Sequence, residues 1–145
     1  MHLQFALAYL ARIHLLTGEL ATAARLIEED SLIAEATGNS PFGYSAMMLA
    51  AWRGQEDTAA ELIQATTREA AAASRPEAGP GVADIFAAAA TAVLDNGLGQ
   101  HDAACGTVRH LVLPDPAAFV IYAPLIVPEL AEAAYRTGGP GQDRP

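Results

Sequence analysis

Three neighbouring side chains could carry chemistry: His101, Asp102 and Cys105 fall within one turn of a predicted helix. Histidine and cysteine at positions i and i+4 lie on the same helix face, and both are common zinc ligands. A zinc site needs three or four ligands, and the next histidine, His110, falls on a different face. We therefore expect no metal, with Cys105 packed as a small apolar residue and His101 filling the aromatic position of a helical repeat.

The same pair could form a cysteine nucleophile with a histidine base. The surrounding sequence shows no third group to orient the histidine and nothing that resembles an oxyanion hole. All eight basic residues are arginines. The absence of lysine excludes a phosphate-loop lysine, a Schiff base and a serine–lysine dyad. We therefore expect no enzymatic activity and no bound cofactor.

An aromatic and thioether cluster is the other candidate, formed by Tyr44, Met47, Met48 and Trp52. Such side chains could line a ligand pocket, because they make adaptable contacts, but packing in the core is the commoner outcome. Their positions in a helical repeat would place some of them on its concave groove. On that basis we predict four partner-binding residues: Arg12, Tyr44, Met48 and Asn96.

The elements that must position these residues are all predicted to be helices. Alanine occurs in blocks such as Ala87–Ala90 and loses no side-chain entropy in a helix. Glycine and proline divide the chain into seven helical segments: Leu3–Leu16, Glu19–Thr37, Phe42–Arg53, Glu56–Ser74, Val82–Asn96, His101–Leu111 and Ala118–Arg136. We expect the last to bend or restart at Pro128, Arg75–Gly81 to be a loop, and Glu28–Asp30 to be a solvated face.

Three of the predicted turns repeat one pattern. Glycine stands at each turn, alanine follows five residues later, and a large apolar residue follows four positions after that: Gly18, Ala23 and Ile27, then Gly54, Ala59 and Ile63, then Gly99, Ala104 and Val108. Glycine permits the left-handed turn between two antiparallel helices, and alanine lets the second helix approach the first closely. The turns lie 36 and 45 residues apart, near the ~34 residues of a tetratricopeptide unit.

The amino-acid sequences at these turns, and one segment near the end of the chain, resemble those of a known protein family. Leu15–Leu20, Leu49–Gly54, Val93–Gly99 and Pro128–Ala134 resemble the helical-repeat region of large ATP-binding LuxR-type transcriptional regulators of actinobacteria. The resemblance covers most of residues 3–138. It implies an all-α chain: an α-solenoid of about three antiparallel, tetratricopeptide-like helix pairs plus a final helix. We expect one domain over residues 1–138 and a flexible tail over 139–145.

In that family a nucleotide-binding module and a helix-turn-helix flank the helical middle. This chain has no Gly-x-x-x-x-Gly-Lys-Ser/Thr motif and no basic last helix, so we transfer none of the family's ATPase or DNA-binding residues. The resemblance implies a non-catalytic module that receives a signal or binds a partner within such a regulator. The alternative is a free-standing tetratricopeptide-like adaptor unrelated to transcription.

Composition narrows the expected partners. The net charge of −9 argues against direct contact with a nucleic-acid backbone, which requires clustered positive charge. The single cysteine requires no oxidising compartment, and no signal peptide or membrane span is evident, so we predict a cytoplasmic protein. We expect a protein, a peptide or a small-molecule inducer as partner, and a homo-oligomer joined through an apolar terminal helix.

Overall fold

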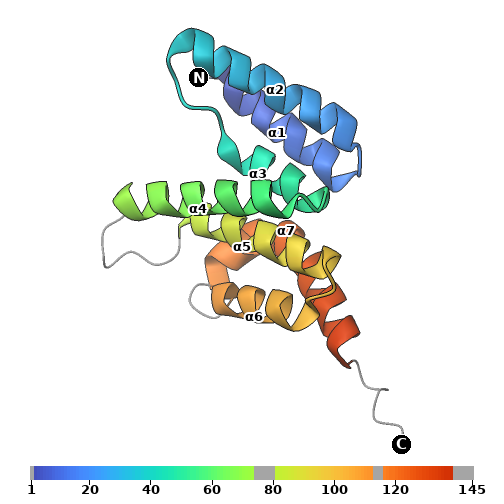
Figure 1. Cartoon of the computed structure of the whole chain (residues 1–145). Helices are drawn as coiled ribbons and strands as arrows, with labels where there is room; N and C mark the ends of the chain where they lie inside the picture. The colour runs from blue at the N-terminus through green and yellow to red at the C-terminus, as the bar shows by residue number, and fades with distance from the viewer. Residues whose placement is uncertain (1, 74–80, 113–115, 139–145) are drawn as a thin grey trace, which may run out of the picture.

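The computed structural model describes residues 2–73, 81–112 and 116–138, and within them every side chain except those of 111, 112, 116–122 and 125. The described ranges form seven helices and contain no strand, which confirms the all-helical class (Figure 1). The helices are α1 (His2–Leu16), α2 (Leu20–Thr37), α3 (Gly43–Trp52), α4 (Glu56–Ala73), α5 (Val82–Gly97), α6 (His101–Val112) and α7 (Pro116–Gly138). Residues 75–80 of the predicted loop Arg75–Gly81, and the predicted tail, lie outside the described residues.

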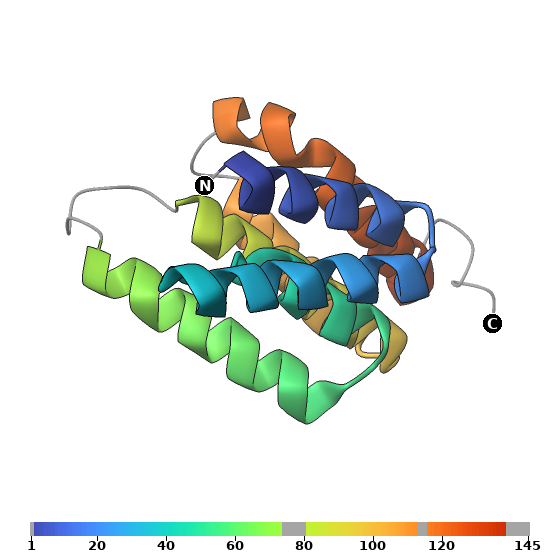
Figure 2. The same ribbon diagram turned by 90° about the horizontal axis from the view of Figure 1, so that it is seen from above.

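Contacts between the helices follow a regular scheme. Each helix packs against the next one in the chain, and the odd-numbered helices also form a row in which α3 contacts α1 and α5, and α5 contacts α7. Within the described ranges, the even-numbered helices contact their odd-numbered neighbours and not one another. Figure 1 shows the pair α1–α2 at one end and α6, with the last part of α7, at the other, and Figure 2 shows α1 and α2 running side by side.

The three repeated turns have the same backbone structure. Gly18, Gly54 and Gly99 adopt φ values of 80°, 65° and 77°, in the left-handed region that glycine tolerates best. In each turn the glycine N–H bonds to the carbonyl three residues earlier, and the next N–H bonds to the carbonyl five residues earlier, with N···O distances between 2.7 and 3.2 Å. These are the bonds that satisfy the last carbonyls of a helix. The predicted turn conformation is therefore confirmed at all three glycines.

The alanines that follow these turns are completely buried. Ala23, Ala59 and Ala104 each have 0% of their surface exposed. A methyl side chain there allows close contact between helices, and a larger one would push them apart. Of the three apolar residues that complete the pattern, Val108 is fully buried, while Ile27 and Ile63 pack at the edge of the core.

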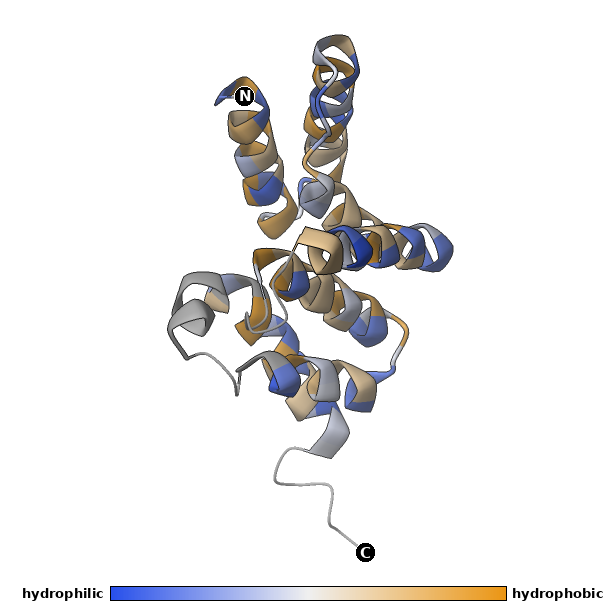
Figure 3. Ribbon diagram, turned by 90° about the vertical axis from the view of Figure 1, so that its left-hand side faces the viewer, coloured by the Kyte–Doolittle hydropathy of each residue, from blue (hydrophilic) through white to orange (hydrophobic). Residues whose placement is uncertain are grey.

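The core is centred on α5, whereas α1 exposes many of its large apolar side chains. Helix α5 contacts α3, α4, α6 and α7, and more than half of its residues are buried. In α1 a row of large apolar residues is exposed: Leu3, Phe5, Tyr9, Leu10, Ile13 and Leu16. Figure 3 shows α1 and α2 projecting away from the rest of the helices. The predicted apolar patch on the first helix is thus confirmed, and the homo-oligomer inferred from it stays a prediction.

One local expectation needs correction, and another is narrowed. Glu28 and Glu29 are exposed as predicted, but Asp30 is only 3% exposed. Its Oδ2 accepts a hydrogen bond of 2.9 Å from the backbone N–H of Phe42, because the segment that leads into α3 crosses that face of α2. Helix α7 runs from Pro116 to Gly138 with Pro128 inside it, so of the two outcomes expected at this proline the restart is excluded. No helix in the described part of the chain is long and apolar enough to cross a membrane.

Candidate functional site

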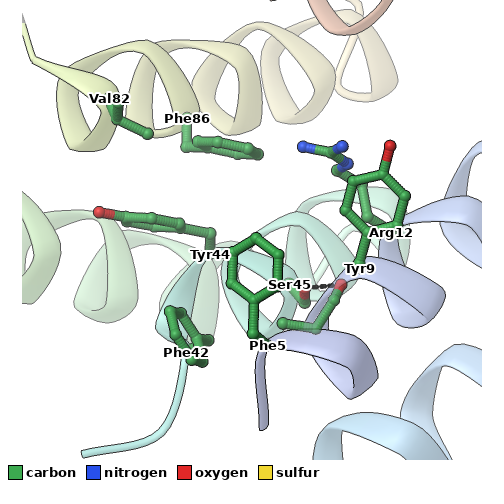
Figure 4. Close-up of a pocket in the computed structure, with 9 residues that line it drawn as sticks. Phe5, Tyr9, Arg12, Phe42, Tyr44, Ser45, Val82 and Phe86 are labelled. Carbon is green, nitrogen blue, oxygen red and sulfur yellow. Dashed lines mark hydrogen bonds between the residues drawn. The ribbon is translucent and has the colours of Figure 1, made fainter. Parts of the chain in front are cut away.

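A pocket lined mainly by aromatic rings opens between the first turns of α3 and α5 and the outer face of α1. We call it the aromatic pocket, and six of its side chains define it: Phe5, Tyr9, Arg12, Phe42, Tyr44 and Phe86. Its volume is about 230 Å³. More than half of the chain's aromatic residues meet here (Figure 4). Clefts with apolar, aromatic walls and one or two polar groups are the usual form of a binding site.

Local structure explains how α1 contributes its share. Phe5, Tyr9 and Arg12 follow one another at spacings of four and three residues, so they form a single stripe along the helix. Phe5 is 62% and Tyr9 is 51% exposed, which leaves most of both rings uncovered. The stripe therefore presents two aromatic surfaces and one charge along the same edge of the pocket.

Helices α3 and α5 supply the opposite wall. The hydrogen bond from Phe42 to the buried Asp30 fixes the entry of α3, and the Ser45 hydroxyl donates to the backbone carbonyl of Ala8 at 3.2 Å. Tyr44 stacks on Phe86, with ring centroids 4.8 Å apart and planes 3° from parallel. These contacts between α2 and α3, α3 and α1, and α3 and α5 hold the aromatic wall in place.

Arg12 gives the aromatic pocket its polarity. Among the described side chains that line the pocket, it is the only charged one. Its guanidinium carbon lies 4.6 Å from the centroid of the Tyr9 ring, within the range of a cation–π contact. In Figure 4 the guanidinium points from α1 toward Phe86. A planar cation next to exposed rings can bind a carboxylate while the rings bind an apolar group.

The four predicted partner-binding residues lie in three different parts of the molecule. Arg12 and Tyr44 meet in the aromatic pocket. Met48 is 3% exposed and belongs to the core, where it borders a second cavity at the other end of α3. The remaining members of the predicted cluster diverge, because Met47 is fully buried and Trp52 is 43% exposed.

Asn96 is part of a buried hydrogen-bond network that joins three helices. Its side-chain Nδ2 donates to the backbone carbonyl of Glu129 at 3.0 Å and to the Glu129 Oε2 at 2.9 Å. The Asn96 Oδ1 therefore faces the Nδ1 of His101, 3.1 Å away, and this geometry assigns the hydrogen to that ring nitrogen. The network links the end of α5 to α6 and α7.

Glu129 is unusual for a carboxylate because it is only 4% exposed. Burial raises its pKa above the ordinary glutamate value, the hydrogen bond from Asn96 opposes that rise, and the nearby Glu132 adds to it. Asp95, beside Asn96 on α5, also has a pKa raised by burial.

Cys105 and His101 are both engaged in contacts within the fold. Cys105 is 8% exposed and packs in the apolar core, as the sequence predicts. His101 uses one ring nitrogen for Asn96. Across residues 2–73, 81–112 and 116–138, no three histidine, cysteine or acidic side chains come together as a possible metal site.

Sequence reasoning missed four of the rings in the aromatic pocket: Phe5, Tyr9, Phe42 and Phe86. The helical spacing of Phe5, Tyr9 and Arg12 is a signal that could have been used, but nothing local shows that Phe42 and Phe86 reach the same place. The chemistry of the assembled pocket suits a ligand group that combines an aromatic or aliphatic surface with a carboxylate. Comparisons of the chain with protein-family models, with curated proteins and with solved structures found no match.

Proposed function

We propose that this chain is a non-catalytic interaction module built as a tetratricopeptide-like α-solenoid. Two observations support the solenoid: the row of odd-numbered helices flanked by even-numbered ones, and the three turns with equivalent hydrogen bonds and buried alanines. In such an arrangement the row of odd-numbered helices forms a continuous surface on which a partner can bind.

The aromatic pocket carries the binding proposal. Exposed rings at Phe5 and Tyr9, a stacked pair at Tyr44 and Phe86, and the cation of Arg12 form one uncovered, mostly apolar site. Exposed aromatic and arginine side chains supply most of the binding energy at protein interfaces. We propose a protein or peptide partner that inserts an apolar side chain and places a carboxylate on Arg12.

We further propose that the module belongs to a LuxR-type transcriptional regulator in the cytoplasm, which rests on the resemblance of the turn sequences. A free-standing adaptor with the same pocket is the alternative. The two proposals differ in genomic context. An in-phase phosphate-loop sequence upstream, or a helix-turn-helix sequence downstream, supports the regulator, whereas a reading frame without either supports the adaptor.

A selection experiment tests the binding proposal. Peptides are selected from a random library on the wild-type chain, and their affinities are measured by fluorescence polarisation. We expect the selected peptides to be rich in aromatic and acidic residues, and both Arg12→Gln and Tyr44→Ala to weaken binding by about tenfold. Arg25→Gln is the matched control, because Arg25 is an exposed arginine on α2 away from the pocket. Peptides that bind all four chains equally would rule out the aromatic pocket as the interaction site.

A further inference from the structure

A second cavity lies at the opposite ends of α1 and α3, and it is closed by α7. We call it the acidic pocket and define it by six of its side chains: Leu16, Leu20, Met48, Trp52, Pro128 and Glu129. Its volume is about 270 Å³, below the roughly 300–1,000 Å³ of pockets that hold drug-sized molecules. Apart from Glu129, these six side chains are apolar or aromatic, so the acidic pocket suits a small and mostly apolar ligand.

Glu129 supplies the charge of this pocket. The residue is only 4% exposed. The Asn96 amide donates a hydrogen bond of 2.9 Å to one of its carboxylate oxygens. No arginine or histidine lines the cavity among the described residues. A buried carboxylate without a cationic partner is costly, and a bound cation would lower that cost.

One backbone feature adds to the negative potential. Pro128 has no N–H, so the carbonyl of Pro124 lacks its helical hydrogen bond, and both prolines line the pocket. The C-terminal end of α1, at Leu16, and the N-terminal end of α2, at Leu20, both line the cavity, so their partial charges oppose one another. The Glu129 carboxylate is therefore the main group that favours a cation in this apolar cavity.

We propose that the acidic pocket binds a small apolar amine in its protonated form. The ammonium group is placed at the Glu129 carboxylate and the Pro124 carbonyl, and the apolar body lies against Leu16, Met48 and the proline rings. Trp52, which is 43% exposed, also lines this pocket, and aromatic rings attract cations. This site lies apart from the aromatic pocket and does not depend on the function proposed for it.

The charge requirement separates this ligand class from its neutral and anionic analogues. A neutral alcohol of the same shape keeps the apolar contacts but leaves the carboxylate without a cation. A carboxylic acid anion is repelled by Glu129. A bare metal ion has too few ligands here, because Glu129 is the only acidic side chain that lines the cavity among the described residues.

Fluorescence of Trp52, the only tryptophan in the chain, reports occupancy directly. The full chain is titrated with 2-phenylethylammonium, with 2-phenylethanol as the neutral analogue and 3-phenylpropionate as the anionic one. We expect a saturable change with the amine, binding about tenfold or more weaker for the alcohol, and no saturation with the anion. Equal affinities for the amine and the alcohol would overturn the proposal, and so would the absence of saturable amine binding.

Paired variants locate the effect. Glu129→Gln should weaken amine binding by about tenfold, whereas Glu35→Gln, which removes an exposed charge from α2 outside the cavity lining, should leave it unchanged. Leu16→Arg serves as a second variant: Leu16 is 49% exposed, so an arginine there places a cation at the pocket without disturbing the core. Amine binding that survives both Glu129→Gln and Leu16→Arg would place the amine elsewhere and overturn the assignment. Circular dichroism establishes that each variant is folded.

Discussion

The aromatic and acidic pockets are built on the same two helices and have opposite character. Along α1, Phe5, Tyr9 and Arg12 face one pocket and Leu16 faces the other. The aromatic pocket has exposed rings and a half-buried cation, whereas the acidic pocket has a nearly inaccessible carboxylate among aliphatic side chains. The difference arises from the third helix that completes each pocket, which is the start of α5 in one case and the proline-containing α7 in the other.

This comparison separates two ways in which a helical row can present a binding site. At the α5 end the exposed rings of Phe5 and Tyr9 lie beside the stacked Tyr44–Phe86 pair, which suits a macromolecular partner. At the α7 end the polar group is held by a buried network, which suits a small ligand. Breaking one arrangement should therefore leave the other largely intact, whereas disturbing a helix that both pockets share should weaken both.

The largest expected effect comes from Asn96→Ala. Removing the amide leaves the buried Glu129 carboxylate and backbone carbonyl without their donor, and we expect a loss of about 3 kcal/mol in the free energy of unfolding. Urea denaturation measures this loss. Asn39→Ala is the control, because Asn39 is an exposed residue whose amide bonds only to Thr37 within the same turn.

The same variant distinguishes the two pockets. Amine binding in the acidic pocket should be lost with Asn96→Ala under conditions in which the chain is still folded, while peptide binding in the aromatic pocket should persist. A parallel loss at both sites would mean that the two pockets are coupled through the fold and are not independent.

Ala59→Leu is expected to have the next largest effect, and it should weaken both pockets together. Ala59 is fully buried in α4, which packs on α3, the helix that both pockets share. The three extra carbon atoms of leucine cannot be accommodated there without separating the helices, so we expect a destabilisation of about 2 kcal/mol. Thermal unfolding measures it, with Ala60→Leu as the control on the exposed face of the same helix. Equal melting temperatures for the two leucine variants would contradict the close contact assigned to the repeated alanines.

The smallest effect is a dependence of stability on pH. Burial raises the pKa of Glu129 in the folded chain above its value in the unfolded chain, so the folded state binds the proton more tightly. Stability from this group is therefore gained as the pH falls through the raised pKa and is lost as the pH rises through it. Between about pH 7 and about pH 5 we expect the melting temperature of the wild type to rise relative to that of Glu129→Gln. A difference between the two chains that does not change over this range would show that the carboxylate titrates normally.

The positions of the helices were accessible from the sequence because they depend on local interactions. All seven predicted segments are helical, and their ends differ from the observed ones by two residues at most. The glycine turns were equally predictable, since their hydrogen bonds join residues three and five positions apart and their backbone angles favour glycine. The buried alanines follow from the same pattern. Cys105 was also placed correctly in the core.

The binding residues were less predictable, because most of their partners are distant in the chain. Arg12 and Tyr44 do meet at a pocket, but the rings of Phe42 and Phe86 that complete it could not be assigned from helix periodicity. Asp30 resembled a solvated acidic residue in sequence, although its carboxylate accepts a bond from a residue twelve positions later. Local pattern shows which face of a helix is polar and does not show which segment will cover that face.

Glu129 illustrates the same limit most clearly. In the sequence it is one charge in an alanine-rich helix that follows a proline, a pattern typical of a solvent-exposed position. Its burial and its place in a pocket depend on the packing of α7 against α5, and this burial raises its pKa. The hydrogen bond that opposes the rise comes from Asn96, 33 residues earlier. The sequence by itself determined the helices and turns, because those arise from bonds between near neighbours. The tertiary structure alone decided which polar groups are buried and where the pockets form, because burial depends on the helices that pack around each group.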